Sequence, residues 1–78
     1  MEELLKIASL VQANNKDEAE AIKGYTDLLA FTMSSNISSE DKQVIADTIN
    51  EIISDELNHQ KRLSELYTKL TNIKANEV

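Results

Sequence analysis

Loop-forming residues cluster at one internal place in this chain, between Ser34 and Ser39. The 78-residue sequence has one glycine and no proline, so few other positions force a helix to stop. Ser38 followed by Asp41 resembles a helix cap and marks the start of a second helix. We therefore expect one all-α domain over residues 1–78, with a helix over 2–33, a turn at 34–39 and a helix over 40–73. Two long helices joined by a short turn favour an antiparallel hairpin.

Apolar residues follow a bundle-core repeat in both predicted helices, with steps that alternate between four and three residues. The stripe of the first helix is Leu4, Ala8, Val11, Asn15, Glu18, Ile22, Tyr25, Leu29 and Thr32, and that of the second is Ile45, Ile49, Ile52, Glu56, His59, Leu63, Leu66, Leu70 and Ile73. Asn15 and Glu18 interrupt the first stripe, and Glu56 and His59 interrupt the second. Each helix is thus predicted to carry polar side chains on an otherwise apolar face.

The two interrupting carboxylates are predicted to lie at the same level of the hairpin. Glu18 precedes Met33 by 15 residues, and Glu56 follows Glu40 by 16. At about 1.5 Å per residue, both lie about 22 to 24 Å from the turn. We therefore expect Glu18 and Glu56 to face each other across adjacent helices.

An ionised carboxylate in a bundle core costs free energy unless it is paired, protonated or bound to a cation. The nearby basic residues, Arg62 among them, occupy helical phases outside both stripes. Glu56 and His59 are three positions apart and share one helix face. Glu18, Glu56 and His59 are therefore candidate ligands for a metal ion from solution.

One hairpin supplies only two carboxylates and one imidazole, which is half of a two-metal site. Two hairpins related by a two-fold axis supply four carboxylates and two imidazoles, and two divalent ions neutralise the four carboxylates. A domain this short also buries little apolar surface, and it has no cysteine for a disulfide. These features predict a homodimer or a larger even-numbered homo-oligomer.

Composition excludes several other kinds of site. The absence of cysteine excludes thiolate-bound zinc, a rubredoxin-type iron centre and a cysteine nucleophile in this chain. A net charge of −6 repels nucleic-acid phosphates and anionic membranes. The sequence has neither a membrane-spanning run nor a basic segment followed by an apolar core at its start. We expect a cytoplasmic protein, either free or inside a protein compartment.

The ligand pattern resembles the ferritin-like superfamily, in which di-iron sites combine two Glu residues with two Glu-x-x-His motifs. Glu18 with Tyr25 in DEAEAIKGYTDLL, and Glu56 with His59 in SDELNHQKRL, resemble rubrerythrin and the short encapsulated ferritins over residues 10–67. Rubrerythrin holds both motif copies in one chain, whereas this chain has one, as encapsulated ferritins do. The resemblance implies a half-bundle that dimerises into a ferritin-like four-helix bundle.

The resemblance also implies roles for individual residues. Glu18, Glu56 and His59 would be the metal ligands and the catalytic residues, and Tyr25 would hydrogen-bond to a ligand carboxylate. The dimer would bind two iron ions, with manganese as the alternative metal. It would oxidise Fe(II) with dioxygen or peroxide, as a ferroxidase-like oxidoreductase for iron handling or protection from oxidative stress. An encapsulating shell would be a further partner, although the tail TNIKANEV lacks the apolar, glycine-containing docking peptide expected of shell cargo.

Other interpretations of the same residues stay open. The polar layer could fix the register of a metal-free dimerisation or adaptor module. A rubrerythrin-like peroxidase would need an external reductase, because the chain has no cysteine. Tyr25 could be an aromatic at the core edge, and Asn15 could either contact His59 or merely interrupt the stripe. Gly24 indicates either close helix approach or local flexibility.

Overall fold

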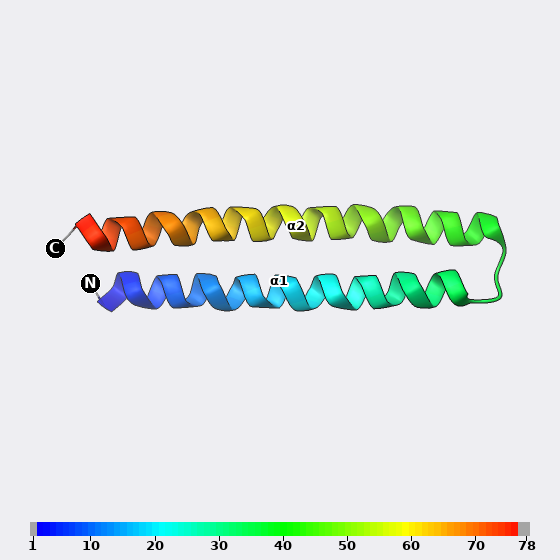
Figure 1. Ribbon diagram of the computed structural model, residues 1–78, viewed down its shortest axis with the longest axis horizontal. Helices are drawn as coiled ribbons and strands as arrows, with labels where there is room; N and C mark the ends of the chain where they lie inside the picture. The colour runs from blue at the N-terminus through cyan, green and yellow to red at the C-terminus, as the bar shows by residue number, and fades with distance from the viewer. Residues whose placement is uncertain (1, 77–78) are drawn as a thin grey trace.

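The computed structural model describes residues 2–76 as two long helices, and it describes side chains over residues 3–73. Helix α1 spans Glu2–Ser34 and helix α2 spans Ser39–Asn76. They run side by side in opposite directions, with the connection at one end and both termini at the other (Figure 1). The molecule measures 60 × 14 × 12 Å. The predicted all-α antiparallel hairpin is confirmed.

Hydrogen bonds stabilise the connection between the helices, and they involve residues from which the turn was predicted. The Ser38 hydroxyl accepts a hydrogen bond of 3.1 Å from the Asp41 backbone N–H, which caps the first turn of α2. At the end of α1, the Ser35 hydroxyl donates to the carbonyl of Phe31 over 2.7 Å. Lys42 reaches back from α2 and donates from Nζ to the Met33 carbonyl over 2.9 Å. These bonds satisfy backbone groups that a helix end leaves unpaired.

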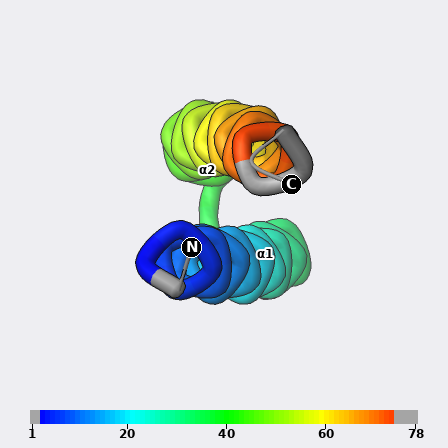
Figure 2. Tube along the Cα trace, turned by 90° about the vertical axis from the view of Figure 1, so that its left-hand side faces the viewer, coloured from blue at the N-terminus to red at the C-terminus, as the bar shows by residue number. Residues whose placement is uncertain are grey.

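The predicted stripe of α1 faces α2 along its whole length. Every member from Leu4 to Thr32 is buried or half-buried, and Ala8, Val11 and Thr32 are the most enclosed. The end-on view shows the two helices crossing at a shallow angle, so a single stripe on each remains in contact (Figure 2). The prediction for α1 is therefore confirmed.

The predicted stripe of α2 is only partly enclosed. Ile49, Ile52, Glu56, Leu63 and Leu70 are buried or half-buried, but the remaining members, Ile45, His59, Leu66 and Ile73, are exposed. The half-buried positions on the other flank are instead Ala46, Ile53, Gln60 and Tyr67. A single neighbouring helix covers only one flank of the repeat, so the other flank of α2 stays open to solvent.

The hairpin leaves more surface in contact with water than a compact protein of its size. Its accessible surface is 5925 Å², whereas the usual scaling for 8.8 kDa gives about 4,800 Å². Among the described side chains, Ala8, Val11 and Ile49 are the only buried apolar residues. Neither described helix contains a stretch apolar enough to cross a bilayer. The hairpin therefore has a thin core relative to its length.

Candidate metal centre

Three potential metal ligands gather about halfway along the hairpin. Glu18 of α1 and Glu56 and His59 of α2 each offer a donor atom, and these atoms all lie within 4.8 Å of one another. An ion with bonds of about 2.1 Å separates opposite ligand atoms by about 4.2 Å, so small side-chain adjustments would let one ion contact all three. The structure thus brings together the three residues that the sequence singled out.

The backbone explains why these three side chains meet. Glu56 and His59 are one helical turn apart and project from the same side of α2. Glu18 stands at the middle of the 33-residue helix α1, at the level predicted from its distance to the turn. Side chains on α1 and α2 at this level belong to stripes that face each other. The antiparallel pairing of two nearly equal helices therefore creates the cluster.

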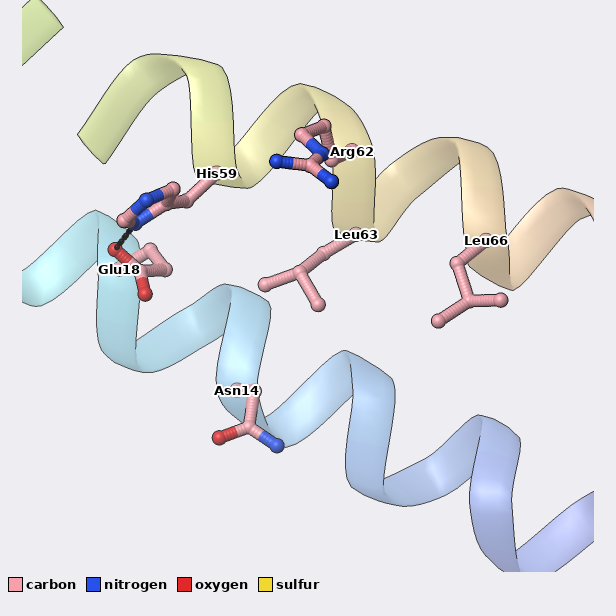
Figure 3. A pocket seen from close by; sticks show the side chains of 6 residues that line it. All are labelled: Asn14, Glu18, His59, Arg62, Leu63 and Leu66. Carbon is pink, nitrogen blue, oxygen red and sulfur yellow. Dashed lines mark ion pairs between the residues drawn. The ribbon is translucent and has the colours of Figure 1, made fainter. Parts of the chain in front are cut away.

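Glu18 and His59 come within ion-pair distance of each other. His59 Nδ1 lies 3.6 Å from Glu18 Oε2, as Figure 3 shows. The two side chains differ in environment, because Glu18 is 24% exposed and His59 is 51% exposed. This separation is longer than a hydrogen bond. The pair can become an ion pair only when the imidazole is protonated.

One oxygen of the Glu18 carboxylate lacks a hydrogen-bond partner among the described residues. Its Oε2 atom is buried, and no donor within the described part of the chain makes a hydrogen bond to it. A buried oxygen of this kind costs free energy, more so when it is charged. A cation placed between Glu18, Glu56 and His59 would supply the missing partner. The unpaired oxygen of Glu18 and the spacing of the three donor atoms therefore both fit a metal ion.

An open groove of about 510 Å³ runs beside the cluster on one side of the hairpin. Its lining residues are Asn14, Glu18, His59, Arg62, Leu63 and Leu66 (Figure 3). Leu63 and Leu66 point from α2 toward α1 in this view and extend the groove toward the termini. Glu18 and His59 are therefore accessible from solvent on this side.

Arg62 lies close to the candidate site. It stands outside the stripe, as predicted, yet it lines the same groove as Glu18 and His59. It lies within 4 Å of no carboxylate among residues 3–73, where His59–Glu18 is the only such pair. Its position three residues after His59 was the available signal, since residues at that spacing share a helix face.

Asn14, rather than Asn15, is the amide on the His59 side of the hairpin. Asn15 Nδ2 donates to Ser64 Oγ over 3.0 Å, and Asn15 lines a different groove with Lys16 and Gln60. Asn14 lines the groove beside His59 and donates from Nδ2 to the Leu10 carbonyl over 2.9 Å. The suggested hydrogen bond between Asn15 and His59 is therefore not formed among the described residues. Asn14 lies four residues before Glu18, which was the signal for its place beside the site.

Tyr25 is half-buried on the stripe of α1, but it belongs neither to the three-residue cluster nor to the lining of the groove. Its predicted hydrogen bond to a ligand carboxylate stays a prediction. For Gly24, a Cβ atom built at this position meets nothing within 4 Å. Close approach of α2 is therefore not the reason for glycine there.

Comparison of the sequence with protein-family models, with curated proteins and with solved structures gives no match.

Proposed function

We propose that this protein is a di-iron carboxylate protein that oxidises Fe(II) at a site shared between two copies of the chain. The observation that carries the proposal is the cluster of Glu18, Glu56 and His59, whose donor atoms lie within 4.8 Å of one another. The buried and unpaired Oε2 of Glu18 supports it independently. The ferritin-like pattern of the sequence supplies the choice of iron, with Mn(II) as the competing metal.

A second copy completes the site because one hairpin has too few ligands. Its cluster offers two carboxylates and one imidazole, on the side of an open groove. Two copies would offer four carboxylates and two imidazoles, and two Fe(II) ions would neutralise the carboxylate charge. The large accessible surface of the hairpin favours such pairing. The resulting assembly is a four-helix bundle with the site at its centre.

Fe(II) is the substrate in this scheme, and dioxygen or hydrogen peroxide is the electron acceptor. Two Fe(II) ions release two electrons on oxidation to Fe(III). These electrons reduce dioxygen to hydrogen peroxide, or hydrogen peroxide to two molecules of water, with uptake of two protons in either case. Carboxylate ligands suit this reaction because hard oxygen donors favour Fe(III). Glu18 and Glu56 hold the ions, while His59 supplies a nitrogen ligand to each.

The test is an anaerobic titration with Fe(II), followed by admission of oxygen. The native protein should bind one Fe(II) per chain and oxidise it faster than buffer does, with the ultraviolet absorbance of carboxylate-bound Fe(III). Glu56→Ala should lose both properties. Glu51→Ala is the matched control, since it removes an exposed acid from the same helix. Equal binding and oxidation by native protein and Glu56→Ala would overturn the proposal.

A metal-free dimerisation or adaptor module is the second candidate. The proximity of His59 Nδ1 to Glu18 Oε2 favours it, because a protonated imidazole would pair with the carboxylate without a metal. This alternative predicts that a chelator leaves both assembly and thermal stability unchanged. A chelator that lowers the melting temperature and dissociates the dimer would exclude it.

A further inference from the structure

Exposed apolar side chains concentrate on the side of the hairpin that carries the groove. Asn14, His59 and Leu66 line that groove, and residues seven apart lie on the same side of a helix. This side, which we call the groove face, comprises Ile7, Asn14, Ala21 and Leu28 on α1 and Ile45, Ile52, His59 and Leu66 on α2. Ile7, Leu28 and Leu66 are 47%, 48% and 42% exposed. The groove face thus extends well beyond the cluster.

The opposite side of the hairpin has fewer exposed apolar side chains, among them Leu5 and Leu57. The groove there is lined by Ser9, Gln12, Ala13, Asn15, Lys16, Ala19 and Gln60. Exposed apolar residues that recur every seven positions on two adjacent helices form the kind of surface that helices bury against one another. The groove face is therefore the side on which a further pair of helices would pack.

The groove face is symmetric about the level of the cluster. On α1, Ile7 and Leu28 lie at equal distances from a point between Asp17 and Glu18. On α2, Ile45 and Leu66 lie at equal distances from a point between Asp55 and Glu56. A second hairpin turned end for end about this level would place its Leu28 against Ile7. The same rotation would place Ile45 against the partner's Leu66.

Charge distinguishes the end-for-end orientation from the one in which both turns lie at the same end. Residues 18–56, the half of the hairpin with the turn, hold nine acidic and two basic side chains, a net charge of −7. Residues 1–17 and 57–78 hold five acidic and six basic side chains, a net charge of +1. A second copy with its turn at the same end would bring two halves of −7 together. A copy turned end for end sets each acidic half against a basic half.

We propose that a second copy of this chain covers the groove face end for end, about a two-fold axis that crosses the helices at the level of Glu18 and Glu56. The inference rests on the proposed function only in that the two copies share the cluster. A face 60 Å long and 14 Å wide is large enough for the roughly 800 Å² per partner of a standard interface. Each copy then contributes Glu18, Glu56 and His59 to one central layer.

The chain has no cysteine, so single-cysteine variants test the orientation directly. Ile7→Cys mixed with Leu28→Cys, in the presence of Mn(II), should form a disulfide-linked dimer on mild oxidation. Ile7→Cys mixed with Leu66→Cys should not, because these positions would lie roughly 30 Å apart between copies. Separate variants exclude links within one chain. All three positions are exposed, so the substitutions leave the hairpin core intact.

The three outcomes separate the orientation from the shared site. A link only between positions 7 and 28 supports the proposal. A link only between positions 7 and 66 overturns the orientation, while a shared metal site would still stand. Absence of both links, with monomer on sedimentation in excess Mn(II), overturns both ideas.

Salt provides a second measurement that needs no substitution. With the carboxylate layer neutralised by excess Mn(II), the end-for-end dimer is held partly by attraction between unlike halves, so raising NaCl from 50 to 500 mM should weaken it by on the order of threefold or more. The alternative orientation predicts tighter association at high salt, because salt screens repulsion between the acidic halves. Tighter association would therefore overturn the proposal.

Discussion

Glu18 and His59 come from the middles of two different helices, yet His59 Nδ1 lies 3.6 Å from Glu18 Oε2. The contact joins a half-buried carboxylate to an exposed imidazole at the edge of the open groove. Only the antiparallel pairing of α1 and α2 brings these residues together. A metal ion bound here would link the two helices and, through the groove face, a second copy.

Arg62 is expected to weaken metal binding, because its positive charge lines the same groove as the ligands. Arg62→Gln should increase the affinity for Mn(II) by roughly two- to fivefold, the effect of one charge several ångströms from a divalent ion in a high-dielectric setting. Lys61→Gln is the matched control, since Lys61 is exposed and outside the groove lining. Calorimetric titration measures both. Equal affinities for the two variants would show that Arg62 does not affect the site.

Tyr25 stands two helical turns from Glu18 on the same stripe, and long side chains on a helix lean toward its N-terminus. We therefore expect its side chain to lean toward the cluster. Tyr25→Phe should keep the iron stoichiometry and slow oxidation severalfold, because it would remove the predicted hydrogen bond to a ligand carboxylate while preserving the ring. Stopped-flow absorbance after oxygen addition measures the rate. An unchanged rate would make Tyr25 a packing residue of α1.

Ser38 should contribute to stability through the cap that it forms with the Asp41 N–H. Ser38→Ala is expected to lower the free energy of unfolding by about 1 kcal/mol. Ser54→Ala provides a comparison, because Ser54 is an exposed position inside α2. Urea unfolding followed by circular dichroism measures both variants. A loss no greater than that of Ser54→Ala would mean that the cap has no stabilising role.

Replacing Glu18 and Glu56 together by leucine should separate assembly from chemistry. The double variant removes carboxylates that repel one another in the dimer, so it should associate without metal and melt at a higher temperature. It should also lose iron oxidation. Sedimentation and thermal unfolding in the presence of a chelator measure these properties. A double variant that stays monomeric would argue against a dimer packed through this layer.

The sequence was sufficient to predict the hairpin because its local signals agree. One cluster of loop residues and the Ser38 cap set the turn, and the repeat of α1 set its buried stripe. The level of Glu18 and Glu56 followed from counting residues along two regular helices. The cluster was predictable because it depends only on helix geometry and register.

The positions at which the prediction and the structure differ, on α2, have one physical cause. A repeat with steps of four and three describes a stripe wide enough for two neighbours, and the sequence does not say which flank the first neighbour covers. The structure places Gln60 and Tyr67 at the helix pair and leaves His59 and Leu66 open. The place of Arg62 in the groove lining was not predicted, for a related reason. Its long side chain lines the groove from a position outside the stripe.

The most direct test of the shared site is native mass spectrometry of the protein with and without a divalent metal. Four carboxylates that converge in one layer oppose association, so metal that binds only the assembled state should shift monomer to dimer. We predict a dimer carrying two Fe(II) or Mn(II) ions, and no such shift in Glu18→Ala, Glu56→Ala or His59→Ala, with Glu20→Ala behaving as the native protein. A monomer that binds one ion tightly and never pairs would contradict the account.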